Sequence, residues 1–178
     1  MIIIGVDPGT VRCGYGLIRK SGSTVQYIDS GVINLSSADS VPFRLGIIYT
    51  RITEKIREYK PEFFALETAF FGKNVQSALK IGYARGAAML AAVHHDLIVA
   101  EYSPREVKKA VTGNGGATKE QVSYMVRTIL SDKAAEFRLD ESDALAIAIC
   151  HSFRAKSDEP NVRNWKDFIK NNPHLVKE

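Results

Sequence analysis

The chain has 178 residues, of which 45% are apolar and 25% are charged. This length suits one domain of ordinary size, and the balance of residue types excludes a disordered or a membrane-embedded chain. The net charge of +4 permits a nucleic-acid partner without requiring one. The opening apolar run is short and ends at Asp7, so we expect no signal peptide, no membrane span and a cytoplasmic location. Cys13 and Cys150 are expected to be free thiols in a reducing compartment.

A strand opens the chain and ends in a carboxylate. The apolar run Ile2–Val6 is typical of a strand buried on both faces, and Pro8 and Gly9 turn the chain directly after Asp7. A carboxylate at the end of such a strand is costly unless it is hydrogen-bonded, ion-paired or bound to a metal ion. Asp7 is therefore either a turn cap or a ligand, and the choice depends on whether other carboxylates arrive at the same place.

The first strand is followed by two more, which predicts an antiparallel meander of three. The second strand is Arg12–Arg19 and the third is Thr24–Leu35, with a turn at Ser21–Ser23 between them. Gly14 and Gly16 lie inside the second strand. Glycine at such positions often marks the close approach of a backbone or a ligand.

A helix and a fourth strand come next. Apolar residues recur at spacings of three and four from Phe43 until Pro61, which ends the helix. The strand Glu62–Leu66 then ends in another acid, Glu67. A right-handed crossover would place this strand parallel to the first and beside it. Asp7 and Glu67 would then share the edge of the sheet where ligands gather in α/β folds, although a coincidence of two acids is the alternative.

The helix predicted over Asn74–His94 is apolar nearly all round, which indicates burial on more than one side. One side should cover the sheet, and the other is a candidate interface with a second subunit. The loop before this helix, Ala69–Lys73, holds two aromatic residues. We expect Phe71 to pack inwards and Phe70 to project towards a substrate.

The region after this helix contains a strand, two helices and a glycine-rich loop, predicted at Leu97–Glu101, Ser103–Val111, Lys119–Leu130 and Thr112–Thr118. The loop lacks the Lys-Ser or Lys-Thr ending of a P-loop, so nucleotide binding there is weakly supported. The region is basic through Arg105, Lys108, Lys109, Lys119 and Arg127. Such a run is usually a solvated face, but lysines on both sides of a glycine-rich loop also suit a surface that follows a phosphate backbone.

The last helix begins near Leu139 and carries Asp140 and Asp143 on one face, which continues into the core. Acids in a first helical turn often serve as caps, and this is the alternative interpretation. Packing of this face on the sheet would bring both acids towards Asp7 and Glu67. Four converging carboxylates repel one another unless divalent cations neutralise them, and hard oxygen ligands suit Mg²⁺ or Mn²⁺.

This order of elements and acids resembles the ribonuclease H-like nuclease fold, an α/β fold with a five-stranded mixed sheet flanked by helices. More closely, the chain resembles bacterial Holliday-junction resolvases of the RuvC type. The matching segments span roughly residues 2–152 and are DPGTVRCGYG, ALETAFFGKN, SALKIGYARGAA, VKKAVTGNGGATKEQV and DESDALAIAICH. The resemblance implies a nuclease domain over residues 1–156 and leaves a polar C-terminal tail, residues 157–178, without a family pattern.

The resemblance also implies the residues of the site. The catalytic and metal-binding acids would be Asp7, Glu67, Asp140 and Asp143, and some family members have a histidine in place of Asp140. These acids would hold two Mg²⁺ ions, for which Mn²⁺ can substitute. The residues expected to contact DNA are Phe70, Lys73, Asn74, Arg85, Lys108 and Lys119. The expected partners are a four-way DNA junction, a second copy of the chain and a branch-migration complex.

We therefore predict an endonuclease that resolves four-way DNA junctions by paired symmetric nicks during recombination and repair, with Asp7 bridging the two metal ions. Three alternatives remain. An actin-like ATPase shares the Asp-x-Gly-Thr turn but needs a second domain, for which 178 residues leave no room. A related nuclease acting on structured RNA would use the same carboxylates. A non-catalytic DNA-binding module would have no need of four converging acids.

Overall fold

The computed structural model describes residues 1–68, 75–131 and 137–155. Five strands form one sheet: β1 (Ile2–Asp7), β2 (Arg12–Ser21), β3 (Thr24–Asn34), β4 (Phe63–Glu67) and β5 (Ile98–Tyr102). The helices are α1 (Val41–Tyr59), α2 (Val75–Val93), α3 (Pro104–Thr112), α4 (Lys119–Ile129) and α5 (Leu139–Arg154). Each predicted element is therefore present, with its ends shifted by a few residues at most. The predicted tail, residues 157–178, lies outside the described residues.

The sheet has the strand order β3-β2-β1-β4-β5, with β1 at its centre. β1 pairs with β2 in antiparallel orientation and with β4 in parallel orientation, and β4 pairs with β5 in parallel orientation. The chain reaches β4 from the meander through α1, which is the predicted crossover. The five-stranded mixed sheet and the parallel placement of the first and fourth strands are confirmed.

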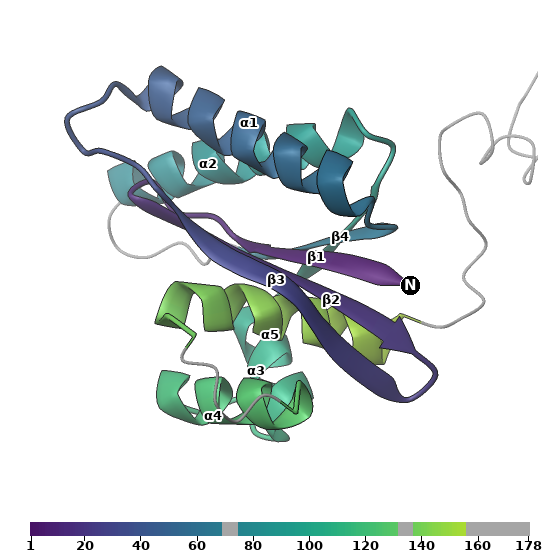
Figure 1. Ribbon diagram of the computed structural model, residues 1–178. Helices are drawn as coiled ribbons and strands as arrows, with labels where there is room; N and C mark the ends of the chain where they lie inside the picture. Colours follow the sequence, from purple (N-terminus) through teal and green to yellow (C-terminus); the bar gives the residue numbers. More distant parts are fainter. Residues whose placement is uncertain (69–74, 132–136, 156–178) are drawn as a thin grey trace, which may run out of the picture.

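Two layers of helices cover the sheet (Figure 1). Helices α1 and α2 lie on one face, and α3, α4 and α5 lie on the other. The alternation of side chains along each strand divides the core in the same way. Ile4 and Val6 of β1 pack with α1 and α2, whereas Ile3 packs on the α5 face. No helix in the described ranges is both long and apolar enough to cross a membrane.

Helix α5 lies directly against the backbone of β1 and β2. A Cβ atom added at Gly5 would lie 2.2 Å from the carbonyl oxygen of Ala144, and one added at Gly14 would lie 2.2 Å from that of Asp140. Real Cβ atoms do not approach other atoms so closely, so only glycine allows this helix position. Gly16 makes a similar contact with Leu145. The predicted close approach at Gly14 and Gly16 is therefore confirmed. The approaching group is the backbone of α5 at Gly14, and both the side chain and the backbone nitrogen of Leu145 at Gly16.

Helix α2 turns small side chains inwards and large apolar side chains outwards. Its buried residues are Ala84, Ala88, Ala91 and Ala92. Its exposed apolar residues include Val75, Leu79, Tyr83, Leu90 and Val93. The alanine side packs with α1 and the sheet, as the all-round apolar pattern predicted. None of the described residues covers the opposite side, an apolar face that is named below the outer face of α2.

The contact at Gly14 can be tested by substitution. We expect Gly14→Ala to lower the free energy of unfolding by about 1–3 kcal/mol, because the methyl group would push α5 away from the sheet. Gly46→Ala is the matched control: Gly46 lies in α1 with nothing within 4 Å of an added Cβ. It should raise the free energy of unfolding by about 0.5–1 kcal/mol. Urea unfolding of both variants measures the difference, and a Gly14→Ala protein of unchanged stability would contradict this packing.

Candidate active site

Asp7 and Glu67 occupy corresponding positions on neighbouring strands. Asp7 ends β1 and Glu67 ends β4, and the residues just before them, Val6 and Leu66, are paired in the parallel ladder. Val6 and Leu66 belong to the core under α1 and α2. Because side chains alternate along a strand, Asp7 and Glu67 are directed to the opposite face, which α5 covers. The sheet thus places two carboxylates side by side under α5.

Helix α5 brings Asp140 and Asp143 to this end of the sheet. Its first turn lies over Gly14, the residue paired with Asp7 in the ladder between β1 and β2. The first turn of α5 is capped by Glu141, whose carboxylate accepts a hydrogen bond from the backbone N–H of Arg138 at 3.4 Å. The side chains of Asp140 and Asp143 remain only 29% and 23% exposed. Asp140 and Asp143 therefore lie at the edge of the core, and their role in a metal site stays a prediction.

The acids interact electrostatically as one group. Burial, and next the charge of Asp143, raise the pKa of Asp7 from its ordinary value of 3.8 to about 6. Burial, followed by the charges of Asp7 and Asp143, raises the pKa of Glu67 from 4.5 to about 7. Asp140 also contributes to the increase at Asp7. The four predicted acids are thus close enough to repel one another.

Two cations offset this repulsion. The ammonium Nζ of Lys119 lies 2.6 Å from Oδ2 of Asp143, and Lys119 lowers the pKa of both Asp7 and Glu67. The guanidinium Nη1 of Arg12 lies 3.6 Å from Oδ2 of Asp140. Sequence reasoning assigned no role to Arg12, although its place five residues after Asp7, beyond the Pro-Gly turn, was a signal that could have been used.

The donor set fits a divalent cation without forming a closed ligand shell. Within the described ranges, no three His, Cys, Asp or Glu side chains are grouped tightly enough to hold a metal ion. Asp143 instead pairs with Lys119, and Asp140 lies beside Arg12. Hard carboxylate oxygens in an excess of negative charge are the ligands that Mg²⁺ and Mn²⁺ prefer. The assignment of Asp7, Glu67, Asp140 and Asp143 as the residues that would hold a metal stays a prediction.

The residues predicted to contact DNA have different surroundings. Lys119 reaches the carboxylates directly, and Lys108 of α3 is close enough to lower the pKa of Glu67. Arg85 of α2 is ion-paired with Glu101 of β5, and its side chain is only 17% exposed. The other three, Phe70, Lys73 and Asn74, lie outside the described residues, as does Phe71. The structure thus brings the two lysines to the acids. All six assignments as DNA contacts stay predictions.

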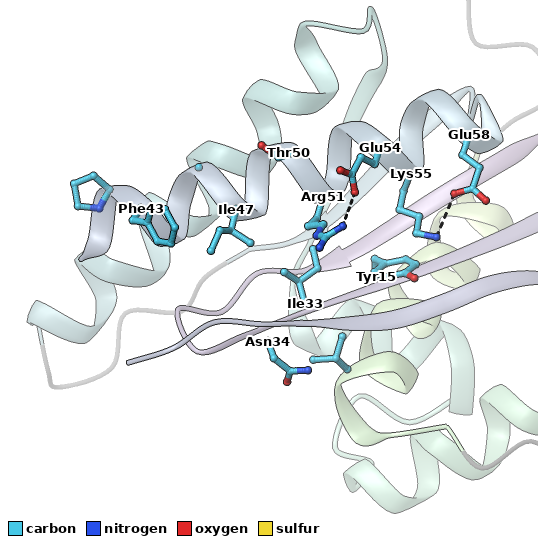
Figure 2. Close-up of a pocket in the computed structure, with 13 residues that line it drawn as sticks. Tyr15, Ile33, Asn34, Phe43, Ile47, Thr50, Arg51, Glu54, Lys55 and Glu58 are labelled. Atoms are coloured by element: carbon cyan, nitrogen blue, oxygen red, sulfur yellow. Dashed lines mark hydrogen bonds and ion pairs between the residues drawn. The ribbon is translucent and has the colours of Figure 1, made fainter. Parts of the chain in front are cut away.

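A large surface hollow lies away from this site. It has a volume of about 1260 Å³ and runs between α1 and the strands β2 and β3 (Figure 2). Its charged residues are of both signs: Arg51 pairs with Glu54, and Lys55 pairs with Glu58. None of the four acids lines it. The hollow is therefore separate from the end of the sheet where the carboxylates and lysines gather.

Comparison with known proteins agrees with this geometry. Residues 3–151 match the family model of RuvC, crossover junction endodeoxyribonuclease. The chain is 46% identical over 179 residues to the RuvC of Salinibacter ruber, with 100% of both chains covered. It is 45% identical over 183 residues to the RuvC of Porphyromonas gingivalis, with 99% of this chain and 97% of the relative covered.

Solved structures show the same relationship. The Thermus thermophilus RuvC structure superimposes with a TM-score of 0.78 at 36% identity, covering 86% of this chain and 94% of that one. T. thermophilus RuvC in complex with a Holliday junction substrate gives a TM-score of 0.79 at 34% identity, with the same coverage.

The strand order, the two acids at parallel strand ends and the acids on the last helix define a nuclease of the ribonuclease H-like class. Within that class, the chain belongs to the RuvC family of crossover junction endodeoxyribonucleases.

The raised pKa values predict how stability depends on pH when a chelator removes metal ions. Asp7 and Glu67 hold their protons more tightly in the folded protein than in the unfolded chain. Their protonation therefore adds to the free energy of unfolding. This contribution is complete below about pH 4 and is lost as the pH rises through about 7. We expect Asp7→Asn and Glu67→Gln to be more stable than the wild type at pH 8, by on the order of 1–2 kcal/mol, and similar to it near pH 4.

Urea unfolding at pH 4, 6 and 8 measures this dependence. Glu54→Gln is the control, because the side chain of Glu54 is 52% exposed and, among the described residues, forms an ion pair only with its helix neighbour Arg51. It should follow the wild type at every pH. A constant stability difference across this range, for either active-site variant, would contradict the proton linkage.

Proposed function

We propose that this chain is a metal-dependent endonuclease that resolves four-way DNA junctions by paired symmetric nicks during recombination and repair. The observation that supports this most is the meeting of four carboxylates and two lysines at one end of the sheet. The family model is that of a crossover junction endodeoxyribonuclease, and the T. thermophilus relative was solved with a Holliday junction substrate. DNA, rather than structured RNA, is therefore the proposed substrate.

The proposed cofactor is Mg²⁺, two ions per site, with Mn²⁺ as a substitute. When bound, such ions would supply an activated water and stabilise negative charge on the scissile phosphate and the leaving oxygen. Asp7 is proposed to contact both ions, because its pKa is raised by the charges of both α5 acids. Glu67 would complete one side of the site, and Asp140 and Asp143 the other.

The basic residues are proposed to position the DNA. Lys119 lies next to Asp143, and its side chain is 58% exposed, so its ammonium can exchange the carboxylate for a phosphate oxygen. Lys108 approaches from α3, on the other side of the glycine-rich loop. Phe70, Lys73, Asn74 and Arg85 are proposed as further DNA contacts on the strength of the family resemblance.

We propose that two copies of the chain act together. The outer face of α2 exposes large apolar side chains, and Gly82 and Gly86 lie between them with nothing within 4 Å of an added Cβ. Glycine weakens a helix interior, and no contact with the described residues requires it at these two positions. A second copy packed against this face would bury the apolar residues and place two active sites about a two-fold axis, as a four-way junction needs. A branch-migration complex is proposed to supply the junction.

The role of Asp7 is tested by Asp7→Asn. We expect this variant to lose at least about a hundredfold in cleavage of a synthetic four-way junction with Mg²⁺, because it loses a metal ligand. Junction affinity should remain within about threefold of the wild type, since the basic surface is intact. Asp96→Asn, at the exposed end of α2, is the control and should cleave normally. A linear duplex and a structured RNA in the same assay separate junction resolution from general nuclease activity and from cleavage of RNA.

The proposed dimer is tested on the outer face of α2. We expect Leu90→Glu to raise the dimer dissociation constant by at least about tenfold, because a carboxylate would replace a buried apolar side chain. The variant should also nick one strand without the paired second nick. Lys80→Glu on the same helix is the control, because Lys80 is exposed and lies outside the apolar face. Analytical ultracentrifugation measures the dissociation constant, and a Leu90→Glu protein that dimerises like the wild type would exclude this face as the interface.

A further inference from the structure

The turn after Asp7 links two residues of the site. It runs from Pro8 to Val11 and ends at Arg12, whose guanidinium lies 3.6 Å from the Asp140 carboxylate. The turn is tight, because a Cβ atom added at Gly9 would lie 2.2 Å from the carbonyl oxygen of Arg12. Any displacement of this turn therefore moves Asp7 on one side and Arg12 on the other.

Two hydrogen bonds from outside hold this turn. The backbone N–H of Leu35 donates to the carbonyl of Val11 at 2.9 Å, at the end of the meander. The guanidinium Nη1 of Arg44 donates to the carbonyl of Thr10 at 2.7 Å. Arg44 belongs to the first turns of α1, which lies on the face of the sheet opposite α5 (Figure 1). The catalytic turn is thus held from the far side of the sheet.

A contribution to the stability of the fold does not by itself explain why an arginine bonds to the Thr10 carbonyl. Its short distance and ionised donor make it one of the stronger kinds of hydrogen bond. However, the Nε atom of Arg44 is buried and has no hydrogen-bond partner in the described part of the chain, which costs free energy. An apolar side chain of similar length could fill the same space without that cost. What the guanidinium adds is a fixed position for the Thr10 carbonyl.

We infer that Arg44 is a positioning residue for the cleavage reaction. By fixing the turn at Thr10, it holds the Asp7 carboxylate in line with Glu67 and the α5 acids, and it holds Arg12 beside Asp140. Arg44 itself touches neither the carboxylates nor, on this arrangement, the DNA. This inference rests on the proposed function, and its test includes a measurement that does not depend on cleavage.

The test compares Arg44→Ala and Arg44→Lys with Arg51→Ala. Arg51 lies on the same helix, is exposed and, within the described part of the chain, forms an ion pair only with Glu54. Its removal should therefore leave cleavage and Mg²⁺ affinity unchanged. We expect Arg44→Ala to slow single-turnover junction cleavage by roughly tenfold to a hundredfold, as small misplacements of catalytic groups do. Its junction dissociation constant should stay within about twofold of the wild type. Arg44→Lys should recover part of the rate, because an ammonium can also donate to the Thr10 carbonyl.

A second measurement is the Mg²⁺ affinity of the protein without DNA, by isothermal titration calorimetry. We expect Arg44→Ala to weaken it by at least about tenfold, at the low end of what loss of a residue supporting a metal ligand causes, with a melting temperature within a few degrees of the wild type. Wild-type cleavage and wild-type Mg²⁺ affinity in Arg44→Ala would overturn the inference. Loss of junction binding with a normal rate at saturation would also overturn it and make Arg44 a DNA contact. If the wild type itself failed to cut junctions, the proposed function would fail, and the Mg²⁺ affinities would still decide the role of Arg44.

Discussion

The site depends on how closely α5 approaches the sheet. Gly5 and Gly14 have no side chains, so the carbonyl oxygens of Ala144 and Asp140 lie where Cβ atoms would otherwise be. A helix held farther away by side chains would increase the distance of Asp140 and Asp143 from Asp7 and so weaken their interaction with it. Burial is the largest cause of the raised pKa of Asp7, and the charges of Asp143 and Asp140 raise it further. Backbone contact between α5 and the sheet is therefore a precondition of the electrostatics.

The clustering of acids under α5 lowers the stability of the folded protein. Burial and mutual repulsion disfavour the ionised forms of Asp7 and Glu67, so these acids weaken the folded protein at the pH where a nuclease needs them charged. A sequence selected only for stability would not have two buried carboxylates that repel each other. The same repulsion would favour the binding of a divalent cation, since its positive charge would offset the repulsion between the carboxylates.

Much of the fold followed from the sequence because its signals are local. The strands were predicted from apolar runs, and the helices from apolar residues spaced three and four apart. Pro8, Gly9 and Pro61 marked the ends of elements. The order of these elements predicted the parallel pair of strands. The convergence of Asp7 and Glu67 followed from topology, since both end strands joined by one crossover. Gly14 and Gly16 were predicted as points of close approach without a partner, because the partner is a helix more than 120 residues later in the chain.

Long side chains were the least predictable part of the site. The pairs of Arg12 with Asp140 and of Lys119 with Asp143, and the hydrogen bond from Arg44 to Thr10, join elements far apart in the sequence. No periodicity or spacing encodes such contacts, because each depends on the conformation of a flexible side chain after the backbone has folded. Arg85 shows the same effect, since the structure pairs it with Glu101 of β5.

The choice of lysine or arginine near the site fits the contact that each side chain makes. Lys119 is a compact charge at the first position of α4, and its pair with Asp143 is partly exposed, so breaking that pair costs little. A lysine at this position can therefore exchange its partner when a metal ion or a phosphate arrives. Arg44 is a planar donor with a buried Nε atom, and its contact is to a backbone carbonyl whose position must not change. Exchangeable charge thus lies on the α5 side of the sheet, where the substrate is proposed to bind, and fixed support lies on the α1 side.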